Sequence, residues 1–182
     1  KTANGIRVMN IVLVGYRAAG KSTIGKKLAT ELGFNFYDVD RFMEPRIAPK
    51  TLSEYYSEVG EIGFRPLETE IVLDLCSRPE SVIAFGAGSL MREKNKHAAK
   101  MNAHIVYIEV PPKELWNRIQ SDPNSHHTRP NLAGGGYKEV EIMLKNREHD
   151  YISCSNLIVN GENSTPEIVR KIVKFYKSNL RT

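Results

Sequence analysis

The sequence has few cysteines and no long apolar segment. Its two cysteines, Cys76 and Cys154, stand far apart without C-x-x-C spacing, so we interpret both as reduced and structural. No apolar stretch approaches the roughly 20 residues that a membrane-spanning helix needs. The mostly polar start, Lys1–Asn10, also lacks the pattern of a secretory signal. We therefore expect a cytoplasmic protein with no membrane partner.

Internal repeats, low-complexity runs and clusters of one charge are absent too. Hydrophobic residues make up 41% of the chain and charged residues 26%, and 182 residues suit one globular domain. The net charge is +5, from 26 basic and 21 acidic residues, but the basic residues are scattered among acidic neighbours. This pattern favours an enzyme that gathers cations around phosphates and carboxylates, and we expect no nucleic-acid partner.

The strongest motif is the segment Gly15–Thr23, which matches G-x-x-x-x-G-K-[ST]. It follows the apolar run 11–14 and precedes a helical pattern, which is the strand–loop–helix context of a phosphate-binding loop. Backbone N–H groups and the positive end of the helix would hold the phosphates. Lys21 should reach the β- and γ-phosphates, and Ser22 should ligate Mg²⁺. The expected nucleotide-binding residues are Gly15, Ala18, Ala19, Gly20, Lys21, Ser22 and Thr23.

A second candidate site follows the short strand 35–37, which ends in Asp38-Val39-Asp40. The period of two along a strand predicts that both carboxylates share one face at the carboxyl end of the sheet, where ligands bind. One acid could hold Mg²⁺ through water while the other accepts a hydrogen bond from a substrate hydroxyl. The alternative is a solvated turn, because Asp is common in turns.

Further elements alternate along the chain. Pro45, Pro49 and the polar residues between them predict a loop, Thr51–Glu54 fits a capping box that begins a short helix, and Gly60 opens a longer helix. Strands are expected at 82–85, 105–108 and 157–159, each followed by a helix or a polar loop. The alternation predicts a three-layer α/β/α sandwich around a parallel sheet. The polar, glycine-rich segment 121–138 is expected to be a mobile lid.

With these pieces in place, the chain resembles the shikimate kinase family, P-loop kinases related to the nucleoside monophosphate kinases. The resemblance runs from Asn10 to the last helix. Four features carry it, and a later Arg147-x-x-x-Tyr151 also fits. They are the phosphate loop, Asp38-x-Asp40, the string Gly60-Glu61-x-x-Phe64-Arg65-x-x-Glu68 and the lid motif Arg129-Pro130-x-Leu132.

The resemblance implies a P-loop fold with five parallel strands in the order 2-3-1-4-5. It also implies transfer of the γ-phosphate of MgATP to the 3-hydroxyl of shikimate, a step of aromatic amino-acid (chorismate) biosynthesis. ATP and Mg²⁺ are the expected cofactors and shikimate the small-molecule partner. We expect residues 1–8 to be an extension or a cloning remnant, and residues 9–182 to form a single, monomeric kinase domain.

The resemblance assigns roles near the phosphates. Asp38 corresponds to the Mg²⁺-linked acid and Asp40 to the residue that holds the reacting hydroxyl. Arg129 resembles the lid arginine that closes over the phosphates, and Arg118 and Asn160 lie where the family contacts the nucleotide. The expected catalytic residues are Lys21, Asp40 and Arg129.

The resemblance also assigns a substrate site. Arg65 and Arg147 correspond to a clamp for the substrate carboxylate, which guanidinium groups suit better than lysines would. This use of its charge also explains an arginine near a helix start, where the helix dipole disfavours it. Gly86, Ala87 and Gly88 stand where the family usually has three glycines. Ala87 departs from that pattern, as Ala18 does in the phosphate loop.

Three alternatives remain open. The first is a kinase for another small hydroxy acid, such as gluconate or quinate. The second is a switch-type GTPase, which needs an N-K-x-D motif, whereas the segment 95–98 reads N-K-H-A. The third is a regulatory protein that keeps the fold without activity, which the intact Lys21, Asp38 and Asp40 disfavour.

Overall fold

The computed structural model describes residues 8–122 and 135–180, and these form five strands, seven α-helices and one short 3₁₀ helix. The strands are β1 (Asn10–Val14), β2 (Asn35–Asp38), β3 (Ser81–Ala84), β4 (Ala103–Glu109) and β5 (Leu157–Asn160). The helices are α1 (Lys21–Leu32), α2 (Val39–Ile47), α3 (Leu52–Ser77), η1 (Ser89–Met91), α4 (Glu93–Asn102), α5 (Pro112–Ser121), α7 (Gly136–Cys154) and α8 (Thr165–Asn179).

All five strands belong to one parallel sheet in the order β2-β3-β1-β4-β5. In the middle of the sheet, Val12 pairs with Ile83 on one side and with Ile105 on the other. The predicted fold class and strand order are therefore confirmed.

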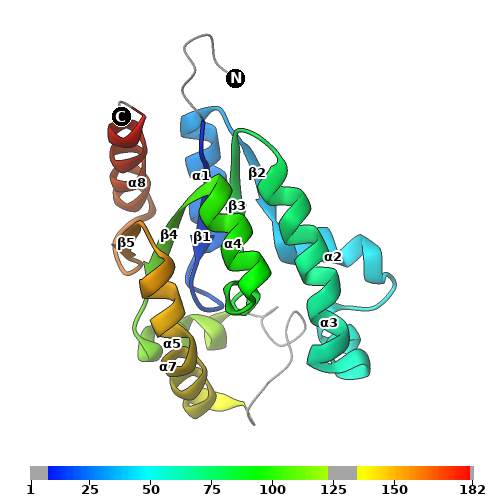
Figure 1. Ribbon diagram of the computed structural model, residues 1–182. Helices are drawn as coiled ribbons and strands as arrows, with labels where there is room; N and C mark the ends of the chain where they lie inside the picture. The colour runs from blue at the N-terminus through cyan, green and yellow to red at the C-terminus, as the bar shows by residue number, and fades with distance from the viewer. Residues whose placement is uncertain (1–7, 123–134, 181–182) are drawn as a thin grey trace.

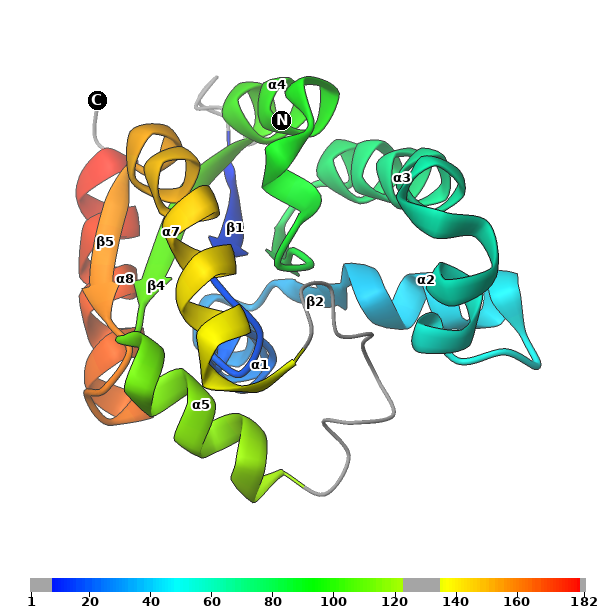
Figure 2. The same cartoon turned by 90° about the horizontal axis from the view of Figure 1, so that it is seen from below.

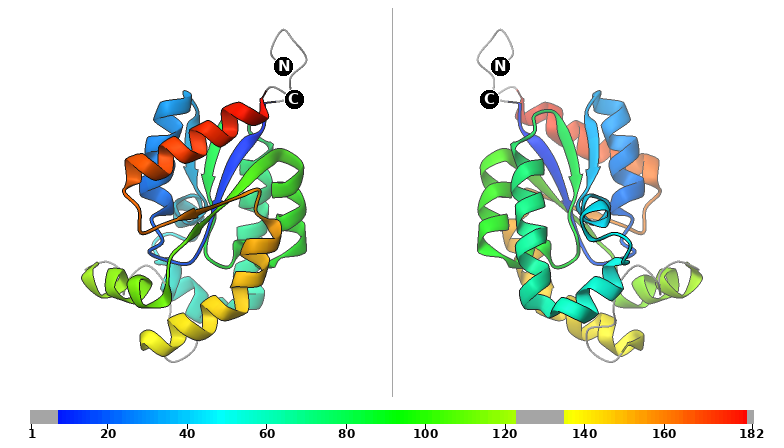
Figure 3. Two further views of the ribbon diagram at one scale, coloured as in Figure 1. Left: turned by 90° about the vertical axis from the view of Figure 1, so that its left-hand side faces the viewer. Right: turned by 90° about the vertical axis from the view of Figure 1, so that its right-hand side faces the viewer.

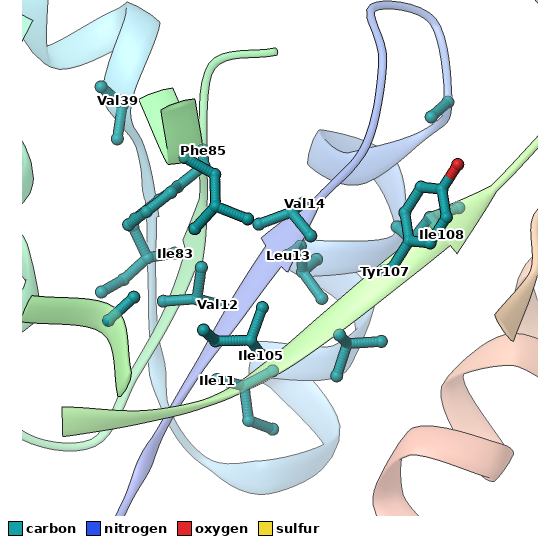
Figure 4. Packing of buried hydrophobic residues seen from close by; sticks show 14 of the residues in the cluster. Ile11, Val12, Leu13, Val14, Val39, Ile83, Phe85, Ile105, Tyr107 and Ile108 are labelled. Carbon is teal, nitrogen blue, oxygen red and sulfur yellow. The ribbon is translucent and has the colours of Figure 1, made fainter. Parts of the chain in front are cut away.

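The core lies along the three central strands. Every residue of β1 and β3 is buried, and so is most of β4, whereas the edge strands β2 and β5 are partly exposed. Figure 4 shows Val12, Ile83 and Ile105 packed together on neighbouring strands. Continuous apolar runs are typical of parallel strands that are covered on both faces. This packing explains why the strands were readily predicted from the sequence.

Helices cover both faces of the sheet (Figures 1 and 3). Helices α1 and α8 lie on one face, and α3 and α4 lie on the other. The hydroxyl of Tyr176 on α8 donates a 3.0 Å hydrogen bond to the carbonyl of Met9, which ties the last helix to the start of β1. None of the helices within the described residues is long and apolar enough to cross a lipid bilayer.

Helix α3 confirms the capping box and the expected break. The Thr51 side chain accepts from the backbone N–H of Glu54, and the Glu54 carboxylate accepts from the N–H of Thr51. Within the helix, Gly60 leaves helical geometry with φ 64° and ψ −175°. The chain therefore forms a short helix and then a longer one that carries Arg65, as predicted.

The expectation for the segment after β2 was wrong. Asp38 ends the strand and Asp40 already lies in the first turn of α2, so the two do not alternate along a strand. Pro45 lies inside α2 and not in a loop. The helix forms because Val39, Met43 and Ile47, four residues apart, bury one apolar stripe against the core.

Helix α4 was absent from the sequence prediction for a different reason. Its buried positions are Asn95, Ala98 and Ala99, a polar residue and two small ones. A helix that buries such residues shows no clear apolar periodicity, although it packs closely against α3 and β4.

The carboxyl ends of all five strands meet at one edge of the sheet. Figure 2 looks onto this edge and shows the start of α1 lying between the α2–α3 side and the α5–α7 side of the molecule. In open parallel sheets, ligands bind at this edge.

Candidate active site

The phosphate loop connects β1 to α1. Its curl depends on residues with positive φ, namely Gly15 (145°), Ala18 (61°) and Gly20 (95°). The ammonium group of Lys21 donates 2.8 Å hydrogen bonds to the carbonyls of Gly15 and Tyr16, and Lys21 is only 8% exposed. The lysine therefore holds the loop in the curved shape that directs backbone N–H groups inward.

Ala18 occupies the left-handed region, which alanine disfavours by roughly 1–2 kcal/mol. This conformation gives a physical reason for the glycine that is common at this position of the family. The alanine at position 18 therefore places backbone strain in the loop.

Ser22, Asp38 and Asp40 lie together beside the loop. The Ser22 hydroxyl donates a 2.6 Å hydrogen bond to Asp38 Oδ2, and Asp38 Oδ1 accepts a 3.1 Å hydrogen bond from the backbone N–H of Asp40. Asp38 is thus the N-cap of α2 and fixes the start of the helix that carries Asp40. The helix cap, and not strand alternation, brings the two acids to the same edge.

Two cavities open at this edge. The first runs along the phosphate loop and is lined, among others, by Ala18, Gly20, Lys21, Ser22, Asp38 and Asp40. The second lies between the start of α7, the middle of α3 and the loop after β3, and its walls include Tyr56, Arg65, Glu68, Gly86, Glu139 and Arg147. Asp40 and Arg17 line both cavities, so the two spaces meet at these residues.

Two buried arginines face the second cavity. The Arg65 guanidinium donates to Glu68 Oε2 at 2.8 Å and to Glu61 Oε1 at 3.0 Å. Burial by itself would lower the pKa of Arg65, but the charge of Glu68 and the bonds to both carboxylates raise it above its ordinary value. Arg147, from α7, places its guanidinium carbon 5.8 Å from the Tyr16 ring centroid, a cation–π contact.

A series of hydrogen bonds holds the Glu68 carboxylate that pairs with Arg65. Glu68 is 1% exposed, and its second oxygen accepts a 2.8 Å hydrogen bond from the Ser89 hydroxyl. The Asn95 side chain in turn donates to the Ser89 carbonyl at 2.8 Å. Helix α4 and η1 thereby hold the carboxylate that orients Arg65.

Gly86, Ala87 and Gly88 follow β3, and they differ in whether the position must be glycine. A Cβ added to Gly86 would lie 3.0 Å from Asp40 Oδ1, and one added to Gly88 would collide with the Arg65 guanidinium. Ala87 already carries a methyl group at a φ that is not positive, and its carbonyl accepts a hydrogen bond from the Tyr151 hydroxyl. Glycine is therefore needed beside Ala87 and not at Ala87 itself.

Replacing Ala87 by glycine is expected to change kcat/KM for shikimate by less than about fivefold, or roughly 1 kcal/mol. The reason is that the Ala87 backbone is unstrained, so glycine relieves nothing. Steady-state kinetics of Ala87→Gly beside the wild type would test this. A gain of tenfold or more would mean that the methyl group restricts the cavity.

Arg118 lies in the last turn of α5, next to Ile119, which lines the phosphate-loop cavity, and Asn160 is the last residue of β5. Arg118 donates to the carbonyl of Gly161 at 2.9 Å and to Glu114 at 2.7 Å, and Asn160 accepts from the backbone N–H of Glu162 at 2.8 Å. Neither residue lines the two cavities. Their predicted contact with the nucleotide stays a prediction, and Arg129 with its lid motif lies outside the described residues.

Sequence reasoning missed several residues of the site. Glu68 belongs to the family string, and its spacing of three from Arg65 on a helix predicts the ion pair that forms. Arg17 occupies a variable position of the phosphate-loop motif, and Glu139 lies far along the chain. No local pattern signals that these two would form an ion pair at 3.6 Å.

The family model described as shikimate kinase matches residues 17–177. A shikimate kinase of Hahella chejuensis is 36% identical over 172 residues, covering 93% of this chain and 87% of the relative. Shikimate kinase 2 of Dickeya chrysanthemi is 33% identical over 165 residues, covering 90% of this chain and 94% of the relative.

A solved structure agrees with these relatives. The shikimate kinase of Acinetobacter baumannii, solved in complex with shikimate, superposes with a TM-score of 0.85 at 28% identity, and the match covers 96% of each chain. The likeness thus extends over nearly the whole length of both chains. The chain belongs to the shikimate kinase family.

Proposed function

We propose that the protein transfers the γ-phosphate of ATP to the 3-hydroxyl of shikimate, which yields shikimate 3-phosphate and ADP. The observation that carries the proposal is the meeting of two cavities at Asp40. One cavity follows a phosphate loop, and the other contains two buried arginines. Such a pair of spaces suits a nucleotide and a small hydroxylated carboxylate.

The acceptor binds through its carboxylate to Arg65 and Arg147. Both side chains are buried, at 6% and 8% exposure, so their interaction with a carboxylate is weakly screened by water. A planar guanidinium can form two parallel hydrogen bonds to a carboxylate, which fixes the orientation of the ring. With the carboxylate held at this end, the hydroxyls of the acceptor point toward Asp40.

The nucleotide phosphates bind the loop and Lys21, and Mg²⁺ fits the oxygen atoms of Ser22 and Asp38. These two oxygens lie 2.6 Å apart beside the phosphate loop, and Mg²⁺ prefers such hard oxygen ligands together with phosphate and water. When bound, the metal would neutralise part of the negative charge on the phosphates.

The transfer uses Asp40 and Lys21. The acceptor hydroxyl oxygen forms a bond to the γ-phosphorus while the bond from this phosphorus to the β–γ bridging oxygen breaks, and ADP leaves. Asp40 orients the hydroxyl and takes its proton, and Lys21 stabilises negative charge on the phosphates. Positioning and charge neutralisation supply most of the rate enhancement in such reactions. We propose Arg129 as a further neutralising charge.

We also propose that the protein works as a monomeric single domain, residues 9–182, in the cytoplasm. The two cysteines are free and buried, as expected in a reducing compartment.

Replacing Arg65 by lysine is expected to raise KM for shikimate about tenfold or more, with little change in KM for ATP. Lysine keeps the positive charge but loses the fork that binds a carboxylate and pairs with Glu68. Steady-state kinetics with each substrate varied in turn would measure both constants. A change confined to the KM for ATP would contradict the carboxylate clamp. Arg46→Lys is the matched control, because Arg46 is an exposed arginine that pairs with the Glu70 carboxylate on the surface.

The proposal is tested by a coupled assay that measures ADP release with shikimate, quinate or gluconate as acceptor. Shikimate is expected to give the highest kcat/KM. Preference for gluconate or quinate would instead identify a kinase for another small hydroxy acid.

A further inference from the structure

Arg17 lies on the wall that the two cavities share. Within residues 8–122 and 135–180, Arg17 and Asp40 are the two that line both the phosphate-loop cavity and the acceptor cavity. A phosphoryl group that moves between the two spaces must pass this wall. Arg17 is thus a cation placed where negative charge is transferred.

The Arg17 guanidinium has hydrogen-bond donors that are poorly paired within the described residues. Its ion pair with Glu139 spans 3.6 Å between Nη2 and Oε1, which exceeds the usual length of a hydrogen bond. Its Nε is buried and has no hydrogen-bond partner among the described residues. Buried polar groups are nearly always paired in folded proteins, so an unpaired one in a site points to an absent ligand.

The backbone holds Arg17 firmly in this position. Tyr16, the residue before it, is bound through its carbonyl to the buried Lys21 ammonium, and its ring is buried. Ala18, the residue after it, is fixed at φ 61°. The side chain can therefore turn between Glu139 and the cavity while its Cα stays in place.

Glu139 offers a resting partner for this side chain. Its carboxylate is 2% exposed and accepts a 2.7 Å hydrogen bond from the backbone N–H of Gly135. An anionic phosphoryl group offers several oxygens to a guanidinium, whereas Glu139 holds Arg17 at a longer distance. A phosphoryl group entering the shared wall would therefore compete well for Arg17.

We propose that Arg17 is a further catalytic residue, which leaves Glu139 and contacts the transferring phosphoryl group between the two cavities. The inference rests on the proposed function, because it requires a kinase reaction at this wall. It assigns Arg17 a role that the phosphate-loop motif, where any residue is allowed at this position, does not imply.

The test compares Arg17→Met with the wild type. We expect the kcat of Arg17→Met to be about 10²-fold lower than that of the wild type, because a charged contact to the transition state is lost. The Kd of MgADP should stay within threefold of the wild-type value. Aluminium fluoride, which mimics the transferring group, should tighten ADP binding in the wild type and not in the variant. A loss of kcat smaller than tenfold, or unchanged tightening by fluoride, would overturn the proposal. If Arg17→Met does not fold, Arg17→Gln is judged by the same limits.

The double variant Arg17→Met/Glu139→Gln separates catalysis from a structural role. If Arg17 only neutralises buried Glu139, removing that charge should restore kcat, and a recovery of tenfold or more would overturn the proposal. We expect no such recovery.

The fluoride measurement needs ADP and no acceptor, so it tests Arg17 even if shikimate is not the substrate. Failure of the wild type to use shikimate would refute the proposed function alone. Failure of the variant to differ from the wild type would refute the role of Arg17 alone.

Discussion

Replacing Lys21 by methionine is expected to lower kcat for shikimate phosphorylation at least 10²-fold. The side chain is buried, lies at the start of α1, and carries the charge that should meet the β- and γ-phosphates. Methionine has a similar length but no charge. The comparison of kcat for the variant and the wild type in the ADP-release assay measures the loss.

The structure adds a second effect of this change. Lys21 also donates hydrogen bonds to the carbonyls of Gly15 and Tyr16, so its loss loosens the loop. Bonds from a charged donor are worth roughly 1.5–3 kcal/mol each, and we expect a lower melting temperature with the fold retained. Lys27→Met, an exposed lysine on the same helix, is the control. A Lys21→Met protein that keeps more than about a tenth of the wild-type kcat would contradict the assignment.

Replacing Asp40 by asparagine is expected to lower kcat by about 10²- to 10⁴-fold. Asparagine has the same shape and can still accept a hydrogen bond from the acceptor hydroxyl, but it cannot take the proton. KM for shikimate should change much less than kcat, because the carboxylate clamp is untouched. Rapid-quench measurement of a single turnover would report the chemical step directly.

Asp74→Asn serves as the control for the Asp40 variant, because Asp74 is an exposed residue that pairs with Arg78 on the surface. It should turn over as the wild type does. If Asp40→Asn kept kcat within about fivefold, Asp40 would only position the hydroxyl, and solvent would take the proton.

The parts of the fold that the sequence predicts are those with a local signal. The buried strands read as continuous apolar runs, and the phosphate loop and the capping box at Thr51 have fixed spacings. The start of α2 has no such clarity. Pro45 lies within this segment and argues against a helix, and Asp40 next to a strand end is compatible with either strand or helix. The segment forms a helix because Met43 and its neighbours on the apolar stripe are buried against the core.

In the site, too, contacts within one helix can be predicted from the sequence, whereas contacts between distant segments cannot. Arg65 and Glu68 are three residues apart on one helix, so their pairing follows from the sequence. Arg17 and Glu139 meet only because the fold brings the start of α7 over the phosphate loop. The close approach of Gly88 to Arg65 is likewise tertiary, which is why the sequence alone leaves the meaning of Ala87 undecided.

The central claim is that the protein places the γ-phosphate of ATP on the 3-hydroxyl of shikimate. Incubation with MgATP and shikimate, followed by phosphorus and proton NMR of the product, tests it most directly. The account predicts one phosphate per shikimate, with phosphorus coupling to the proton on C3 and one ADP formed for each product. Phosphate on a different hydroxyl, or ADP formed without phosphorylated shikimate, would contradict it.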